Sequence, residues 1–193
     1  MSVTRLVLKA KPPADGSPDK LKARTAARGD LQKGNEWQDI WSACVSMRTV
    51  KMFLALACSF KRRAKQGDFA GAHLQAQART RIFVKLDERH KEHSPDLTHY
   101  FSRPLLLNRG IYGLAVSGKF WNEEFSEWLT AEGFHHSTAD TTYFIKHYPN
   151  GSWLRLIFYV DDCLYFGSND EIEKKFEERV IAYNRPFVGP VHT

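Results

Sequence analysis

Two segments carry apolar side chains at helical spacing. In residues 46–60 the apolar positions recur every three or four residues and Ser46 is a suitable N-cap, so the pattern predicts a helix. Residues 117–132 show the same spacing, and Gly133 is a typical C-terminal stop. The apolar stripe of this second helix comprises Phe120, Trp121, Phe125, Trp128 and Leu129.

A near-continuous apolar run gives the strongest strand signal. Residues 153–160 are apolar at almost every position, which is typical of a strand covered on both faces. Asp161 and Asp162 interrupt the run and residues 163–167 resume it, so we expect a hairpin with two carboxylates at its tip. Weaker signals predict strands at 82–86 and 143–147 and a turn at 149–151.

The two ends of the chain give different signals. Residues 171–183 are predicted to form a last helix, and Asp170 and Glu173 have the spacing of a capping box. Residues 11–36 are polar, with prolines and glycines that mark a turn or mobile loop. A solvated surface and a phosphate-facing flap both explain the basic residues of this stretch, and the pattern leaves the two open. These residues are Lys20, Lys22, Arg24, Arg28 and Lys33.

Composition favours a folded protein with an anionic partner. Of the 193 residues 42% are hydrophobic, and the formal net charge of +6 favours nucleic acid. Three cysteines at spacings that match no zinc or disulfide pattern favour reduced thiols. No segment approaches the roughly 18 apolar residues of a membrane span, and the start lacks the apolar run of a signal peptide. We expect a protein of the cytoplasm or nucleus.

The adjacent carboxylates Asp161 and Asp162 are the sharpest chemical feature. Like charges so close raise each other's pKa unless a cation compensates them. An ordinary exposed turn also accepts Asp, which is the plain alternative. Here the flanking residues are apolar and the turn has no glycine, so the context favours a functional pair.

Five blocks of sequence, in a fixed order and spacing, together resemble one known family. They are KARTAARGDLQ at 22–32, RTVKMFLALA at 48–57, IYGL at 111–114, GFHHSTADTTYFIK at 133–146 and FYVDDCLYFGSND at 158–170. In order and spacing they resemble the copia-type retrotransposon reverse transcriptases from about Lys20 to Val180, and YVDD is the signature of that enzyme class.

The resemblance implies a fold and a division of the chain. The expected fold is α+β: a polymerase palm, which is an antiparallel sheet backed by helices, with partial fingers and no thumb. Residues 1–19 would be a flexible N-terminal segment, 20–183 the fingers and palm region, and 184–193 a tail. The thumb and RNase H regions of a parent polyprotein would be missing.

The resemblance also implies the chemistry of two-metal nucleotide addition. Asp68, Asp161 and Asp162 would be the catalytic, metal-binding carboxylates for two Mg²⁺ or Mn²⁺ ions. Asp68 and Asp161 would bridge the ions. Because successive strand side chains point to opposite faces, Asp162 would have a supporting role. The partners would be an RNA or DNA primer–template and deoxynucleoside triphosphates.

Nucleotide binding is implied for a second set of residues. Arg24 resembles the fingers arginine that contacts the triphosphate, and its fork suits phosphate oxygens. Tyr112 and Gly113 resemble the floor of the nucleotide pocket, although an aromatic-plus-turn packing unit explains them equally well. The full set is Arg24, Lys22, His73, Tyr112 and Gly113.

Two departures from the family pattern bear on function. Val116 stands where the family has a glutamine that positions the nucleotide, and His73 stands where it has an aromatic ring that excludes the ribose 2′-hydroxyl. The main interpretation is an RNA-dependent DNA polymerase core. The alternatives are an inactive, truncated retrotransposon remnant that binds nucleic acid, and a structural domain in which YVDD is accidental.

Overall fold

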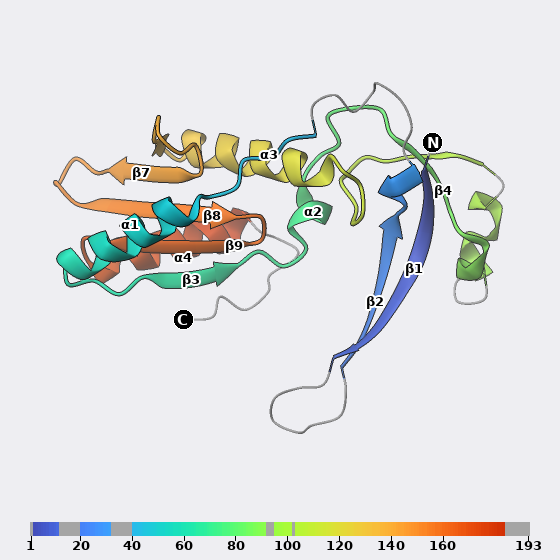
Figure 1. The fold of residues 1–193 in the computed structure, drawn as a ribbon, viewed down its shortest axis with the longest axis horizontal. Coiled ribbons are helices and arrows are strands. Elements are labelled where there is room, and N and C mark those ends of the chain that lie inside the picture. The colour runs from blue at the N-terminus through green and yellow to red at the C-terminus, as the bar shows by residue number, and fades with distance from the viewer. Residues whose placement is uncertain (1, 12–19, 32–39, 92–94, 102, 184–193) are drawn as a thin grey trace. The chain divides into compact units, whose positions relative to one another are not determined.

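The chain folds into two compact units. The computed structural model describes residues 2–11, 20–31, 40–91, 95–101 and 103–183. The first unit comprises Met1–Trp41 and Ala76–Phe120, and the second comprises Ser42–Gln75 and Trp121–Thr193. Both contain strands and helices (Figure 1), so the predicted mixed α+β class is confirmed.

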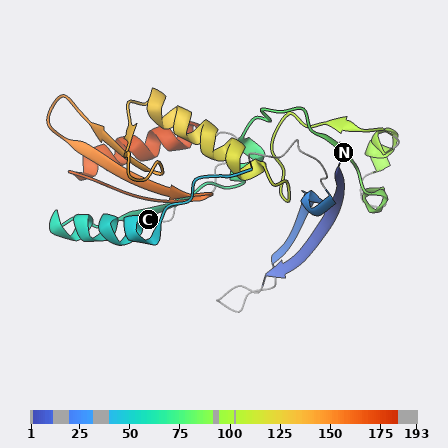
Figure 2. The same ribbon diagram turned by 45° about the horizontal axis from the view of Figure 1, so that its top comes forward.

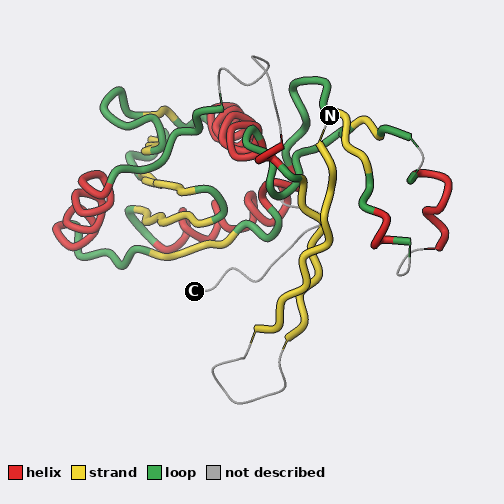
Figure 3. The backbone as a smooth tube through the Cα atoms, turned by 45° about the vertical axis from the view of Figure 1, so that its right-hand side comes forward, coloured by secondary structure: helices red, strands yellow, loops and turns green. Residues whose placement is uncertain are grey.

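The first unit is built on a four-stranded sheet. Its strands are β1 (Ser2–Lys11), β2 (Lys20–Ala27), β4 (Phe83–Lys85) and β5 (Leu105–Leu106), and its 3-10 helices are η1 (Gly29–Leu31), η3 (Glu88–His90) and η4 (Pro95–Tyr100). The strand order is β2-β1-β4-β5, in which only the β1–β4 pair is parallel. Figure 3 shows β1 and β2 as a long two-stranded ribbon.

The basic segment of the sequence is therefore partly a strand. Residues 20–27 form β2 and pair with β1 along its length, a pairing that the hydrophobic pattern did not predict. The predicted strand at 82–86 is confirmed as β4. The expected turn around Pro12, Pro13, Gly16 and Pro18 lies outside the described residues, as does Lys33.

The second unit is built on a five-stranded antiparallel sheet with the order β3-β9-β8-β7-β6. Its strands are β3 (Lys65–Asp68), β6 (His135–His136), β7 (Tyr143–His147), β8 (Trp153–Tyr159) and β9 (Asp162–Gly167), and its helices are α1 (Met47–Ser59), α2 (Ala72–Gln75), α3 (Ser117–Ala131, in this unit from Trp121 on) and α4 (Asp170–Tyr183). Strands β8 and β9 form the predicted hairpin.

Helices cover both faces of this sheet (Figure 2). On one face, the ring of Phe53 from α1 packs on Phe166 with centroids 4.8 Å apart. On the other, Phe125 from α3 packs on Phe158 at 5.0 Å, and Phe176 from α4 packs on Tyr165 at 5.1 Å. Burial on both sides explains why β8 reads as a continuous apolar run.

The bounds of the predicted helices agree with the structure within one or two residues. Two of the predicted end signals are also confirmed. The Ser46 hydroxyl accepts a hydrogen bond from the amide of Thr49 at 3.1 Å, which confirms Ser46 as the N-cap of α1. Gly133 has φ of 86° just after α3, as its role as a C-terminal stop requires. Strand β7 matches its predicted range.

The predicted capping box of the last helix is wrong. The side chain of Asn169, not Asp170, accepts from the amide of Ile172 at 3.0 Å and caps α4. Asp170 instead pairs with Arg62 at 2.5 Å. Spacing alone did not separate these roles, because Asn and Asp serve equally well as caps and the partner of Asp170 is distant in sequence.

A buried carboxylate anchors α4 to the sheet. Glu173 is 1% exposed and accepts hydrogen bonds from Arg62 at 2.7 Å and from the amide of Gly167 at 2.9 Å. Lys65 at the start of β3 lies 3.2 Å from the same carboxylate. A buried charge of this kind is tolerated because cations and hydrogen bonds compensate it.

A second carboxylate ties α1 to the loop before β7. One oxygen of Asp140 accepts from the amide of Ser46 at 3.2 Å and from the hydroxyl of Thr49 at 2.5 Å. The other accepts from the amide of Thr142 at 3.0 Å and from its hydroxyl at 2.5 Å. Burial acts to raise the pKa of Asp140, but these hydrogen bonds outweigh it and lower the pKa below its ordinary value.

Within the described ranges, no helix combines the length and apolarity that crossing a bilayer requires.

We predict that Asp140→Asn destabilises the protein by about 1–3 kcal/mol at neutral pH, because the new amide group must face one of the donors that the carboxylate satisfies. The native pKa of Asp140 is depressed, so its contribution is complete above the unfolded-state pKa of about 3.9 and is lost as the pH falls through the lower folded value. Urea unfolding at pH 7 and pH 3 measures both effects.

The matched control for this prediction is Asp170→Asn, the same chemical change at a side chain that is 89% exposed. It should alter the midpoint of unfolding little. Equal effects of the two substitutions at pH 7 would contradict the role assigned to Asp140.

Candidate active site

The β8–β9 hairpin ends in a strained two-residue turn. Tyr159 pairs with Asp162, which leaves Val160 and Asp161 as the turn residues. Val160 has φ of 54°, and a positive φ at the first turn position fits the type II′ geometry that usually takes glycine there. For a β-branched residue this conformation is an outlier, and such strain gathers at functional sites.

Strand pairing brings Asp68 to this turn. Asp68 ends β3 and lies directly opposite Asp162 in the antiparallel ladder, where facing residues share one side of the sheet with Cβ atoms about 4.5–5.5 Å apart. The amide of the next residue, Phe69, donates to the main-chain oxygen of Asp161 at 2.7 Å. The three predicted aspartates therefore lie at the same end of the sheet, and all three residues are exposed.

The register changes the expected relation between the two hairpin carboxylates. Strand alternation was expected to set Asp162 apart from Asp68 and Asp161. The structure instead places Asp161 in the turn, outside the alternation, and puts Asp162 on the same face as Asp68. The alternation argument does not apply to Asp161, because this residue lies in the turn, and the supporting role of Asp162 stays a prediction.

Gln66 belongs to the site and was not predicted. Its side-chain amide donates to one carboxylate oxygen of Asp162 at 3.0 Å. Gln66 lies two residues before Asp68 on β3, so the two side chains share a face. That spacing was the only available signal in the sequence, and it identifies Gln66 only once Asp68 is known to end a strand.

The donor chemistry of this end of the sheet fits a hard divalent cation, because carboxylate oxygens are the ligands that Mg²⁺ and Mn²⁺ prefer. The side chains do not form a closed cage: across the described part of the chain, no three His, Cys, Asp or Glu side chains group closely enough to hold a metal ion. The nearby thiol of Cys163 is unsuited to the task. Burial raises its pKa to about 12, which keeps it protonated at neutral pH.

A cavity of about 290 Å³ opens beside Asp162. Its floor is mostly apolar, and Gln66, Tyr159 and Asp162 contribute its polar groups. Tyr159 is 51% exposed and directly faces Asp162 across the hairpin. The cavity is lined by Val45, Val50, Gln66, Ile157, Phe158, Tyr159, Asp162, Cys163 and Leu164.

The predicted nucleotide-binding residues other than His73 lie in the first unit. Lys22 and Arg24 are two residues apart on β2 and so share one face of the ribbon, where Lys9 lies opposite Lys22. The guanidinium of Arg24 lies 5.0 Å from the ring centre of Tyr112, a cation–π distance. The structure thus brings Lys22, Arg24 and Tyr112 together within this unit.

Gly113 has a packing reason to be glycine. Its φ is 82°, and a Cβ placed there would lie 2.2 Å from the carbonyl oxygen of Ala27. The amide of Ala27 donates to the carbonyl of Tyr112 at 2.7 Å, so the two segments touch along their backbones. The Tyr-Gly pair of the IYGL block is therefore explained in part by packing, and its part in nucleotide binding stays a prediction.

The two departures from the family pattern have different surroundings. Val116 is 5% exposed, and its carbonyl accepts from the amide of Phe120 at 3.0 Å at the start of α3. It is a buried apolar residue and offers no side-chain polar group to a ligand. His73 lies half-buried in the short helix α2.

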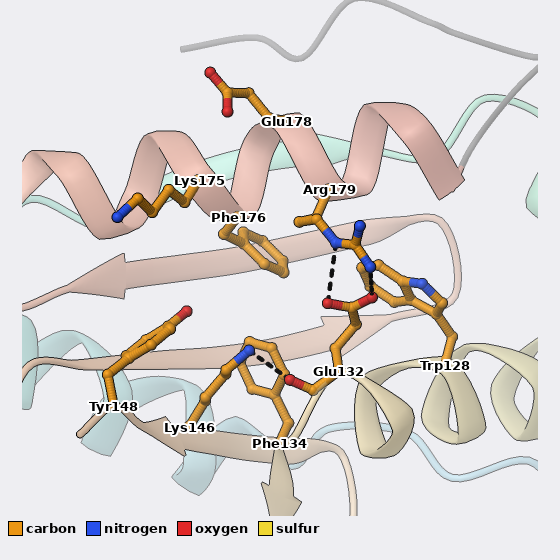
Figure 4. A pocket seen from close by; sticks show the side chains of 9 residues that line it. All are labelled: Trp128, Glu132, Phe134, Lys146, Tyr148, Lys175, Phe176, Glu178 and Arg179. Carbon is orange, nitrogen blue, oxygen red and sulfur yellow. Dashed lines mark hydrogen bonds and ion pairs between the residues drawn. The ribbon is translucent and has the colours of Figure 1, made fainter.

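A larger cavity lies elsewhere in the second unit, between α3, α4 and β7 (Figure 4). Its volume is about 390 Å³. Arg179 donates to the carboxylate of Glu132 at 3.1 Å, and Lys146 donates to the main-chain oxygen of Glu132 at 2.5 Å. Figure 4 shows Glu178 pointing away from the other lining residues. Arg179 is thus paired with the Glu132 carboxylate, and Lys146 donates to a neutral main-chain oxygen.

Comparison with known proteins gives one consistent family. Residues 3–185 match the family described as "Reverse transcriptase (RNA-dependent DNA polymerase)". The chain is 24% identical over 172 residues to the "Retrovirus-related Pol polyprotein from transposon TNT 1-94" of Nicotiana tabacum, a match that covers 89% of this chain and 13% of that polyprotein.

Two relatives from Arabidopsis thaliana agree with this match. The Pol polyproteins from transposons RE2 and RE1 are each 26% identical, over 83% and 81% of this chain and 11% and 10% of their own lengths. The chain thus spans about a tenth of the length of these relatives. No solved structure was found to match it.

We predict that Gly113→Ala destabilises the protein far more than Gly151→Ala. Both glycines have φ near 80°, but a Cβ at Gly151 meets no atom within 4 Å, whereas one at Gly113 collides with the backbone. The difference in free energy of unfolding should be at least about 2 kcal/mol, because the clash adds to the shared conformational cost. Urea unfolding followed by circular dichroism measures it, and equal destabilisation would refute the packing explanation.

Proposed function

The chain belongs to the reverse transcriptase (RNA-dependent DNA polymerase) family, and from that premise we propose that it is the fingers and palm part of a polymerase that adds deoxynucleotides to a primer. The second unit is the palm, and the first unit contributes the fingers. One observation carries the proposal: Asp68 lies opposite Asp162, and the residue after it is hydrogen-bonded to Asp161.

The proposed chemistry is nucleotidyl transfer at the hairpin tip. Members of this family generally use divalent metal ions, and two bound Mg²⁺ or Mn²⁺ ions would stabilise the charge on the attacking and leaving oxygens. Asp68 and Asp161 would supply the carboxylate oxygens that hold them. Asp162 keeps a supporting role, because one of its oxygens already accepts a hydrogen bond from Gln66.

The remaining residues of the tip have proposed roles that follow from their surroundings. Gln66 holds the carboxylate of Asp162 in one orientation. Tyr159 and the mostly apolar cavity beside Asp162 offer a surface for the sugar and base of the primer end. Such a cavity excludes water on one side and leaves the carboxylates exposed on the other.

The first unit would bind phosphate. Arg24 and Lys22 share one face of the ribbon, and the guanidinium of Arg24 is braced over the ring of Tyr112. An arginine held in this way loses less freedom when it grips a triphosphate. The partners are an RNA or DNA primer–template and deoxynucleoside triphosphates, consistent with the net charge of +6.

The alternative function is nucleic-acid binding without catalysis. It is favoured by Val116, whose buried apolar side chain stands in place of a glutamine expected to position the nucleotide. This version of the protein would bind primer–template through its basic residues and leave it unchanged.

Primer extension separates the two functions. With Mn²⁺ or Mg²⁺ we expect extension of a primed template, and Asp161→Asn should reduce the rate about a hundredfold or more because a carboxylate that holds the ions is removed. Asp170→Asn, a distant exposed control, should leave the rate unchanged. The readout is the length of labelled primer resolved on a gel.

The control arm measures binding of the same primer–template. Both Asp161→Asn and the wild type should bind, with affinity that falls steeply as salt rises. Binding without extension at any metal concentration would establish the alternative. Extension that survives Asp161→Asn would remove the proposed catalytic site.

A further inference from the structure

Trp121 holds the carbonyl of the strained turn residue. Its side chain is 0% exposed, and its indole N–H donates to the main-chain oxygen of Val160 at 2.5 Å. Because the peptide group is planar, fixing this oxygen fixes the orientation of the whole peptide unit that joins Val160 to Asp161. A residue of α3 therefore controls one of the two peptide planes beside Asp161.

The second plane beside Asp161 is held by the residue that follows Asp68. The amide of Phe69 donates to the main-chain oxygen of Asp161 at 2.7 Å, which orients the peptide unit that joins Asp161 to Asp162. The rings of Phe69 and Trp121 pack with centroids 5.3 Å apart. Trp121 thus holds one of the peptide planes that flank Asp161, and Phe69 holds the other. The two residues are in contact, and Phe69 directly follows Asp68 in the chain.

Trp121 is itself held rigidly. Its ring stacks on Phe125 with centroids 5.2 Å apart and planes 8° from parallel. Phe125 is also 0% exposed and stacks in turn on Trp128 at 5.6 Å. A group that positions another residue works only if its own rotamer is locked by packing, and the contact with the fully buried Phe125 supplies that locking.

The strain at Val160 explains why the turn needs a hydrogen bond from outside the hairpin. Valine disfavours the positive φ that it adopts here, so without an external contact the turn would relax towards other conformations. Strained turns persist only where the surroundings over-determine them. The indole hydrogen bond is the contact that reaches the carbonyl of the strained residue itself.

We propose that Trp121 is a positioning residue for Asp161. By holding the Val160 carbonyl it keeps the turn in its strained form and so sets the direction of the Asp161 carboxylate relative to Asp68. The inference rests on the proposed function for its consequence in catalysis, but the hold itself is a property of the folded chain and is testable without activity.

The test is Trp121→Phe, which keeps an aromatic ring in the stack and removes the N–H. Hydrogen exchange of the segment that contains the turn should become about five- to tenfold faster, the factor that corresponds to one lost hydrogen bond. Trp128→Phe is the matched control: it makes the same change on the same helix, away from the turn, and should leave exchange at the turn unchanged.

Kinetics give the second readout. Trp121→Phe should lower kcat for primer extension by about tenfold or more with little change in KM for the nucleotide, because a misplaced carboxylate slows chemistry without removing substrate contacts. In a Val160→Gly background the loss should shrink, since glycine adopts the positive φ without an external hold. A merely structural role would instead give additive losses.

The outcomes separate the inference from the proposed function. If the wild type extends no primer, the proposed function fails while the exchange measurement still decides the role of Trp121. If extension occurs but Trp121→Phe matches Trp128→Phe in turn exchange and in kcat, the positioning role is overturned and the polymerase function stands. Faster exchange at the turn that is confined to Trp121→Phe supports the proposal.

Discussion

The pairing of β3 with β9 places Asp68 beside the hairpin that carries Asp161 and Asp162. A slip of one residue would turn Asp68 to the opposite face of the sheet. Steric fit enforces the register: Gly67 lies opposite Cys163, and a Cβ at Gly67 would come within 3.0 Å of the buried sulfur. The small residue before Asp68 is thus part of the mechanism by which two distant segments meet.

The rest of the second unit acts as a rigid frame around this pairing. Asp140 ties the start of α1 to the loop before β7, and Glu173 ties α4 to Arg62 and to the end of β9. Trp121 reaches from α3 to the turn. Val160 has a positive φ that a β-branched residue disfavours, and it lies where conformational freedom would most disturb the chemistry. Stable elements therefore support one strained and exposed functional end.

Sequence patterns predicted the elements better than the contacts between them. Helical periodicity gave α1 and α3, and the interrupted apolar run gave the hairpin with Asp161 at its tip, because these signals are local. The pairing of Asp162 with Asp68 was not predicted, since it depends on the register between β3 and β9. Gln66 and the indole N–H of Trp121 were not predicted as parts of the site at all: their partners are distant in sequence, and only the register brings them together.

The central claim is that Asp68 and Asp161 converge to hold divalent cations at the hairpin tip. Anomalous diffraction from crystals of the protein soaked in Mn²⁺ tests it most directly, because manganese scatters anomalously and shares the oxygen preference of magnesium. The account predicts a manganese peak within bonding distance of carboxylate oxygens of both residues, absent in Asp68→Asn. A manganese ion bound elsewhere, or none at the tip at millimolar Mn²⁺, would contradict it.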